Sequence, residues 1–274
     1  MGWVEVGAGV FQRRYEPVDV SVGAIVGERG TTVVDTRNNG REGAEILRDA
    51  EVFGVPVVAV VNTHAHYDHT FGNQAFAERG IPIHGHAGIP AHFARFEAPR
   101  LRAVQAEPSS EPDKDWAGVR LTPPDVPVAA PTRLELGGRT VELVPVDPGH
   151  TDTDLAVRVP DAGVWLLGDV IEQSGAPLFG SGSFPLRWGA SLRSVLERIG
   201  PHDVIVPGHG SAVDHSFAAE QARLLEEVGA MVRRSFEAGI PVDEVAPPAE
   251  VAALWPQWML RSALGAGYAQ LACA

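Results

Sequence analysis

The segment His64–His69 places three imidazoles and one carboxylate within six consecutive residues, and this dense run constrains the fold more than any other part of the chain. It follows an apolar, β-branched run over Val57–Val61, which is typical of a buried strand. Imidazole and carboxylate groups are the ligands of hydrolytic zinc sites and contribute little as packing groups. We therefore expect the cluster at the carboxyl end of a core strand, where ligand sites are common.

Three further apolar runs end in the same way, at a polar residue beside a glycine. His150, Asp169 and His209 follow runs that end near residues 146, 167 and 206. Glycine beside a ligand allows a tight turn and a close approach of backbone to metal. The candidate metal ligands are therefore His64, His66, Asp68, His69, His150, Asp169 and His209.

Charge and cysteine content limit the partners of the chain. Its net charge of −13 disfavours extended nucleic-acid binding, which draws its affinity from Lys and Arg contacts to phosphate. The single cysteine, Cys273, excludes a disulfide within the chain and leaves metal ligation to His, Asp or Glu. We find neither an apolar stretch of about eighteen residues nor a signal peptide, so we expect a cytoplasmic protein with no membrane partner.

The order of elements favours an α/β fold, and residues 1–274 are interpreted as a single domain. Strands are predicted at 18–26, 31–35, 57–61, 81–84, 140–146, 155–159, 164–167 and 204–206. Helices are predicted at 41–53, 71–78, 191–199, 217–238 and 258–271, so the C-terminal part is helical from about 216.

A proline-rich insert at about 88–131 interrupts this pattern. Its eight prolines predict no long regular element beyond short helical turns. An insert of this length is either a lid or binding loop, or a surface insertion without contact to the site.

The motifs resemble those of the metallo-β-lactamase fold superfamily of hydrolases. The pattern H-x-H-x-D-H, then G-H, then G-D, then P-G-H-G is matched in order between about residues 20 and 215. The resemblance implies an αββα sandwich, in which two mixed β-sheets face each other with helices outside and metals at one edge.

The resemblance also implies roles for the candidate ligands. His64, His66 and His150 would bind a first metal, Asp68, His69 and His209 a second, and Asp169 would bridge the two. The cofactors would be two zinc ions, for which iron or manganese are the substitutes. Two metals roughly 3.5–4 Å apart share a bridging hydroxide as nucleophile, and Asp68 would act as the catalytic proton carrier.

The remaining histidines are interpreted as ordinary polar residues rather than ligands. They lie outside the four motifs: His84, His86, His92, His202 and His215.

Departures from the branches of the superfamily narrow the reaction. Those β-lactamases whose dinuclear site uses thiolate place cysteine where Asp169 stands here, so β-lactam hydrolysis is not expected. Transfer-RNA-processing nucleases would need a basic surface. Thioesterases of the glyoxalase II type carry G-H-E-Y-T where residues 208–212 read G-H-G-S-A. We therefore predict a dinuclear zinc hydrolase of a small ester, thioester or lactone.

Two segments could border the substrate. The Gly- and Ser-rich stretch at 170–183 suits a mobile wall for an apolar substrate, and a plain surface loop is the alternative. The aromatic cluster near the C-terminus favours a core or homodimer contact over a roof on the site. Its members are Trp255, Trp258, Met259 and Tyr268.

Two other functions stay open at this point. A mononuclear iron oxygenase of the persulfide dioxygenase type would use His64, His66 and His150 with Asp169, and would leave the second site idle. A non-catalytic metal-binding protein would keep the residues without turnover.

Overall fold

The strands form two mixed sheets that meet at one residue pair. The computed structural model describes residues 2–273, and its strands run in the order β7-β6-β5-β4-β3-β12-β11-β10-β9-β8, with β2 and β1 following on β3. The first sheet contains β1 (Val4–Gly7), β2 (Val10–Tyr15), β3 (Val20–Gly27), β4 (Gly30–Val34), β5 (Val57–Val61), β6 (Ile83–His86) and β7 (Val126–Val128). The second contains β8 (Thr132–Glu135), β9 (Thr140–Pro145), β10 (Leu155–Val159), β11 (Val164–Glu172) and β12 (Val204–His209). Only His209 and Val20 pair across the junction of β12 and β3.

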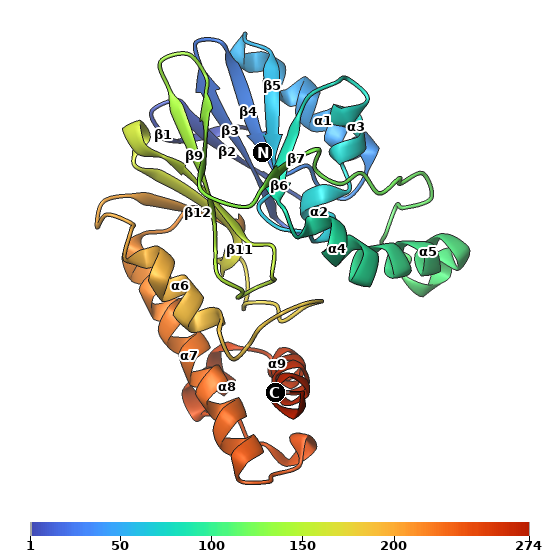
Figure 1. Cartoon of the computed structure of the whole chain (residues 1–274), viewed down its shortest axis with the longest axis vertical. Coiled ribbons are helices and arrows are strands. Elements are labelled where there is room, and N and C mark those ends of the chain that lie inside the picture. Colours follow the sequence, from blue (N-terminus) through green and yellow to red (C-terminus); the bar gives the residue numbers. More distant parts are fainter. Residues whose placement is uncertain (1, 274) are drawn as a thin grey trace.

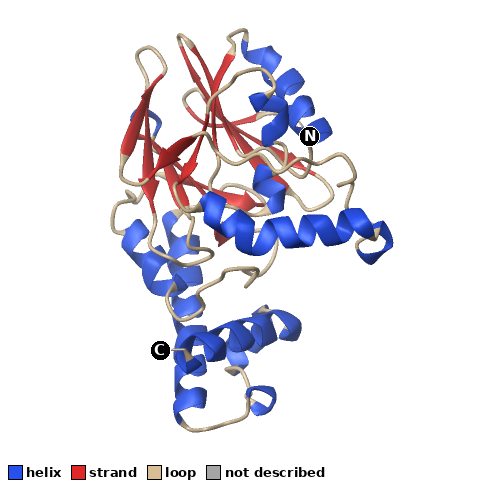
Figure 2. Cartoon of the chain, turned by 45° about the vertical axis from the view of Figure 1, so that its right-hand side comes forward, coloured by secondary structure: helices blue, strands red, loops and turns tan. Residues whose placement is uncertain are grey.

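Helices flank the two sheets, some against their outer faces and others beyond them at one end of the molecule (Figures 1 and 2). They are α1 (Gly40–Ala50), α2 (Tyr67–Thr70), α3 (Asn73–Ala77), α4 (Ile89–His92), α5 (Ala98–Ala106), α6 (Trp188–Leu196), α7 (His215–Glu237), α8 (Ala249–Leu254) and α9 (Gln257–Ala272). A π turn spans Phe93–Glu97, and short 3₁₀ turns cover Glu51–Phe53, Pro108–Ser110, Pro160–Ala162 and Val242–Glu244.

Local sequence explains several of these boundaries. The side chain of Asn39 accepts a hydrogen bond from the backbone of Glu42 and begins α1, and Asp214 begins α7 in the same way at Phe217. Strand β5 is an unbroken apolar run because it lies between two parallel neighbours and is covered on both faces.

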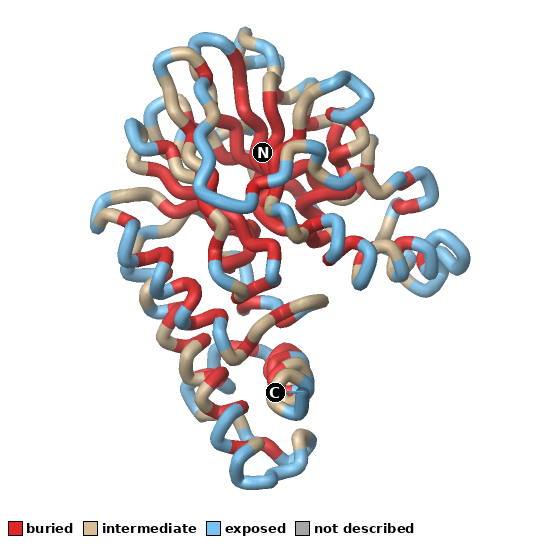
Figure 3. Tube along the Cα trace, in the orientation of Figure 1, coloured by how far each residue is buried: buried red, intermediate tan, exposed pale blue. Residues whose placement is uncertain are grey.

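Three apolar clusters hold the layers together, and the buried residues follow the strands and the inner sides of the helices (Figure 3). One cluster fills the space between the sheets, with Ile25 and Val61 from the first and Leu143 and Leu155 from the second. The others join the first sheet to α1 and α3, and the second to α6, α7 and α9. The predicted αββα sandwich of two mixed sheets is confirmed.

The insert contradicts one sequence-based prediction. Residues 89–106 are helical without a break, as α4, the π turn and α5, although prolines at 90 and 99 predicted only short turns. Each proline lies in the first turn of its helix, where its missing amide proton is not required. The π turn lies directly before α5, so the hydrogen-bond pattern changes there and Pro99 falls in the first turn of a new α-helix.

Other boundaries differ in smaller ways. Strands β1, β2, β7 and β8 and helices α2 and α8 were not predicted, and the helix expected at 71–78 is shortened to α3. In the described residues, no helix is both long and apolar enough to cross a membrane.

Candidate metal centre

The seven predicted ligands meet at the edge where the two sheets join. Extended backbone at His66 places His64 and His66 on one side of the chain, as in a strand. The chain then enters α2, whose first turn carries Asp68 and His69 to a neighbouring position. The other three ligands come from the second sheet, at the loop after β9, within β11 and at the last residue of β12: His150, Asp169 and His209.

One detail differs from the sequence prediction. Asp169 was expected just after its strand, but β11 continues to Glu172. The pairing with β12 shifts register on both sides of Gly168, so the irregular strand still directs Asp169 to the sheet edge.

The first group contains His64, His66, His150 and Asp169, all buried. His150 Nε2 lies 2.9 Å from His66 Nδ1, and it lies 3.5 Å from Asp169 Oδ2. His64 Nε2 lies 3.7 Å from the same oxygen and has no hydrogen-bond partner in the described residues. Ring nitrogens that face one another around a carboxylate oxygen are the donor set of a divalent metal.

The second group contains Asp68, His69 and His209, again buried. Their Nε2 and carboxylate atoms converge: His209 Nε2 is 3.4 Å from Asp68 Oδ2 and 3.4 Å from His69 Nε2. The other oxygen of Asp169, Oδ1, lies 3.0 Å from His69 Nε2 and 3.5 Å from His209 Nε2. Asp169 therefore directs one oxygen to each group, as a bridging ligand does.

The second nitrogen of most of these rings is held by an oxygen. His69 Nδ1 donates to Asp35 at 2.8 Å, His209 Nδ1 donates to the carbonyl of Val18 at 2.7 Å, and His66 Nε2 donates to the carbonyl of Ser181 at 3.0 Å. These contacts fix the tautomer and leave the inward nitrogen free to bind a metal.

Electrostatics also fits a cationic occupant. Burial acts to lower the pKa of His69 and His209, but neighbouring carboxylates, Asp169 first, outweigh it and raise both pKa values well above normal. Burial acts to raise the pKa of Asp68, but His69 and His209 lower it to about 2. Burial lowers the pKa of His150 to about 3, so this ring stays neutral. Buried carboxylates and neutral imidazoles together accept divalent cations.

Two glycines let the backbone approach the ligands closely. A Cβ atom on Gly208 would lie 1.8 Å from Asp169 Oδ1. Gly168 has a φ of +54°, and its Cβ would lie 2.4 Å from Thr63 Oγ1. Only glycine fits these positions without displacing a ligand or its support.

Several residues near the ligands were not identified from the sequence. Glu172 groups with Asp169 and His209, and burial, then Asp169, raises its pKa well above normal. His92, interpreted as an ordinary polar residue, groups with Glu97 and His66. The register shift in β11 and the π turn produce these positions, and neither has a sequence signal that would reveal them.

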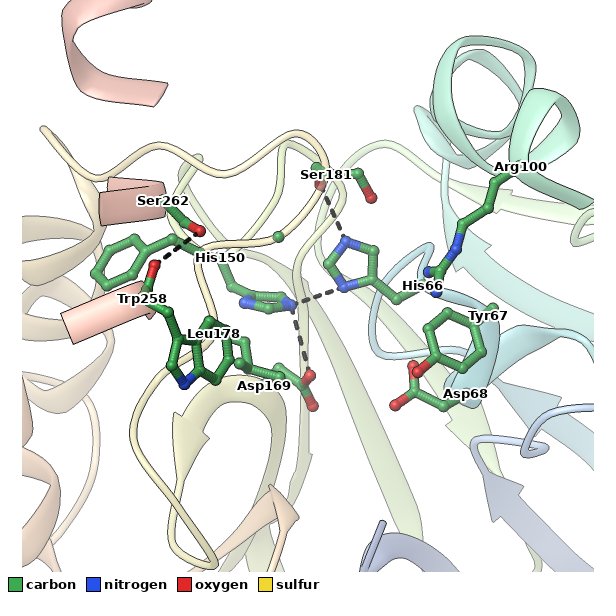
Figure 4. A pocket seen from close by; sticks show the side chains of 12 residues that line it. His66, Tyr67, Asp68, Arg100, His150, Asp169, Leu178, Ser181, Trp258 and Ser262 are labelled. Carbon is green, nitrogen blue, oxygen red and sulfur yellow. Dashed lines mark hydrogen bonds and ion pairs between the residues drawn. The ribbon is translucent and has the colours of Figure 1, made fainter. Parts of the chain in front are cut away.

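A cavity of about 360 Å³ opens from the first group (Figure 4). It is lined by Arg100 of the insert, by residues 178–181, and by Trp258 and Ser262 of α9. The proline-rich insert at 88–131 and the stretch at 170–183 therefore both border the site. The C-terminal aromatic cluster divides: Trp255 and Met259 are buried in the core, whereas Trp258 faces the cavity and is 62% exposed.

Comparison with known proteins agrees with the geometry. The model of the metallo-beta-lactamase superfamily matches residues 15–209. A metallo-beta-lactamase type 2 of Bacillus cereus is 26% identical over 82% of this chain and 79% of its own length. A hydroxyacylglutathione hydrolase of Anaeromyxobacter dehalogenans is 27% identical over 65% of this chain and 61% of its own length.

Solved structures share the fold over different lengths. A metallo-beta-lactamase from Pontibacter korlensis superposes with a TM-score of 0.64 and 21% identity over 82% of this chain and 98% of its own. A double mutant of a sec-alkyl sulfatase gives a TM-score of 0.77 and 19% identity over 98% of this chain and 50% of its own. The second match extends over the C-terminal helices.

Proposed function

Since the chain belongs to the metallo-β-lactamase superfamily, we propose that it is a dinuclear zinc-dependent hydrolase of a small ester, thioester or lactone. One observation carries the proposal: Asp169 directs one carboxylate oxygen at each of two complete ligand groups. A single-metal enzyme needs only His64, His66, His150 and Asp169. A single-metal site would not explain why Asp68, His69 and His209 converge beside that first group.

The residues of the chain position the reaction. When bound, paired divalent metals lower the pKa of water toward 7 and polarise the oxygen of the scissile bond. Asp68 belongs to the second group and also lines the cavity, so its ionised carboxylate is placed to accept the proton that the attacking water loses and to pass it to the leaving group. Ser181, which lines the cavity, holds His66 in place through its carbonyl.

The comparisons support acyl transfer to water as the reaction class. Hydroxyacylglutathione hydrolases are named for a thioester substrate, and β-lactamases for a cyclic amide. Asp169 stands where the β-lactamases with a thiolate ligand place cysteine, and that difference favours an ester, thioester or lactone over a β-lactam.

Metal analysis combined with a substrate panel tests the proposal. We expect about two zinc ions per chain and turnover of acyl esters, thioesters or lactones above phosphodiesters and β-lactams. One iron per chain with oxygen consumption would instead support the mononuclear oxygenase.

Asp68→Ala tests the catalytic assignment. We expect the variant to lose turnover by at least about 100-fold and to bind less of the second metal, because it removes a ligand and the proton carrier together. Asp203→Ala serves as the matched control. Asp203 is a carboxylate remote from the ligands, and it accepts a hydrogen bond from Trp165. Unchanged ester turnover in metal-loaded Asp68→Ala would overturn the assignment of Asp68 as the proton carrier.

A further inference from the structure

The cavity above the metal centre has one apolar wall built from two distant segments. Leu178 and Phe179 come from the loop between β11 and α6, and Trp258 comes from α9 (Figure 4). Phe179 is buried and packs edge-on against Trp188, with ring centroids 5.1 Å apart. Leu178 and Phe179 lie within residues 15–209 that match the superfamily, whereas Trp258 lies beyond them, in the C-terminal helices.

The wall exposes apolar surface that the fold does not use. Trp258 is 62% exposed and Leu178 is 40% exposed, although each has buried neighbours. Large apolar side chains left in solvent next to a cavity mark a binding surface more often than isolated ones do.

The wall is also held in position before any ligand arrives. Met259 and Leu260 of α9 are buried in the core against α7. Gln270 of α9 donates a hydrogen bond to the carbonyl of Ser183 at 2.8 Å, which ties the helix to the loop. A preformed wall binds without the entropic cost of ordering these segments.

The opposite side of the cavity offers no free positive charge. Apart from the candidate ligands, Arg100 is the cationic residue that lines the cavity in the described part of the chain. Its guanidinium makes two hydrogen bonds to Glu111, at 2.9 and 2.5 Å, and stacks 4.7 Å from the ring of Tyr67. Because Glu111 balances its charge and occupies two of its donors, this guanidinium attracts a substrate carboxylate less than an unpaired arginine would.

From this apolar wall and the neutralised arginine, we infer that the substrate carries a neutral, apolar chain that lies against Leu178, Phe179 and Trp258. This inference rests on the proposed function, because it places the scissile ester or thioester at the metal centre. It names medium-length acyl or alkyl chains as the substrate class and disfavours thioesters of charged peptides. Trp258 then determines specificity for chain length.

A chain-length series on zinc-loaded protein tests the inference. The probes are 4-nitrophenyl esters from acetate to octanoate. We expect kcat/KM to rise about threefold with each added methylene that reaches the wall. In Trp258→Ala the loss of kcat/KM grows with chain length, to about tenfold or more at octanoate, and Trp258→Phe recovers most of it.

Leu254→Ala is the matched control. Leu254 belongs to the same C-terminal segment and is 59% exposed, but it does not line this cavity. We expect its chain-length dependence to equal that of the wild type. The same slope in Trp258→Ala and in the wild type would overturn the inference, and so would a preference for a glutathione thioester over an equally long neutral thioester.

A binding measurement separates this inference from the proposed function. Calorimetric titration of zinc-loaded protein with 1-octanol should give binding that Trp258→Ala weakens about tenfold and Leu254→Ala leaves intact. If 1-octanol binds in this way but no ester or thioester is hydrolysed, the proposed function fails and the apolar wall stands. If esters are hydrolysed without regard to chain length, the wall fails and the proposed function stands.

Discussion

Asp35 shows how a residue outside the ligand set supports the metal centre. Its Oδ2 accepts a hydrogen bond from His69 Nδ1, and both of its oxygens accept from Thr63, through the backbone and the hydroxyl. The residue adopts a φ of +68°, which is unusual for a side chain other than glycine. This strained backbone position is maintained because three hydrogen bonds converge on one carboxylate.

We predict that Asp35→Asn lowers metal affinity by about 10- to 100-fold, since the orientation and basicity of His69 depend on this carboxylate. Competition with a zinc chelator measures the change. Asp203→Asn, a carboxylate that accepts from Gly200 and Trp165 far from the ligands, should keep the affinity of the wild type. An equal affinity in both variants would show that His69 needs no outer partner.

Asp154 is a second buried carboxylate with a measurable consequence. It accepts three hydrogen bonds from the backbone and hydroxyl of Thr151, yet burial outweighs them and raises its pKa to about 7. Between its unfolded pKa near 3.8 and about pH 7, the folded chain therefore binds more protons at this site than the unfolded chain. Its ionisation destabilises the fold as pH rises through this window.

We predict that Asp154→Asn removes this contribution because the amide cannot ionise. Relative to the wild type, the variant should gain up to about 4 kcal/mol in free energy of unfolding between pH 4 and pH 7.5. Urea unfolding of both proteins at these two pH values measures it. A difference between variant and wild type that stays constant with pH would mean that Asp154 titrates normally.

At the scale of elements, the strand ends are placed by close backbone contacts as well as by hydrogen bonds. Strands β11 and β12 run parallel and pass beside each other at Gly208 and Asp169. This approach is closer than any side chain permits, and it positions Asp169 between the two ligand groups.

We predict that Gly208→Ala lowers metal occupancy from two ions toward one or none and destabilises the fold by about 1–3 kcal/mol. The new Cβ would lie 1.8 Å from Asp169 Oδ1, so the carboxylate must move. Gly175→Ala is the control, because nothing lies within 4 Å of its Cβ position. Atomic absorption and thermal unfolding give the two readouts, and full occupancy in Gly208→Ala would contradict the bridging role of Asp169.

For the whole molecule, the candidate metal centre joins the two halves of the sandwich. Four of the seven ligands follow β5 of the first sheet, and three belong to the second sheet. Within residues 2–273, the strands of the two sheets pair directly at only one residue pair, His209 with Val20. Metal bound at this edge would therefore cross-link the halves where backbone pairing is sparse.

We predict that removal of metal by a chelator lowers the midpoint of thermal unfolding by about 10 °C. The reason is that a ligand that binds only the folded chain stabilises it by mass action. Differential scanning calorimetry measures the shift, and zinc added back in excess should restore the midpoint. A midpoint that does not respond to chelator or zinc would show that the centre adds no cross-link.

Periodicity and the order of elements indicated the α/β class, the resemblance of the motifs to a known superfamily implied the αββα sandwich, and motif spacing selected seven residues that the structure brings together. Each apolar run must be buried, and the polar residues at its end gain from a site at the sheet edge, so the local pattern and the tertiary arrangement agree. The same reasoning was wrong for residues 89–106, since a π turn allows a proline to begin a second helical stretch.

Tertiary structure alone decided what surrounds the ligands. Asp35, Glu172 and the apolar wall with Trp258 reach the site from segments far apart in the sequence. No local pattern records such contacts, because they depend on a register shift in β11 and on how α9 packs against α7. The sequence by itself therefore determined which side chains can serve as metal ligands, and packing decided which surface lies beside them.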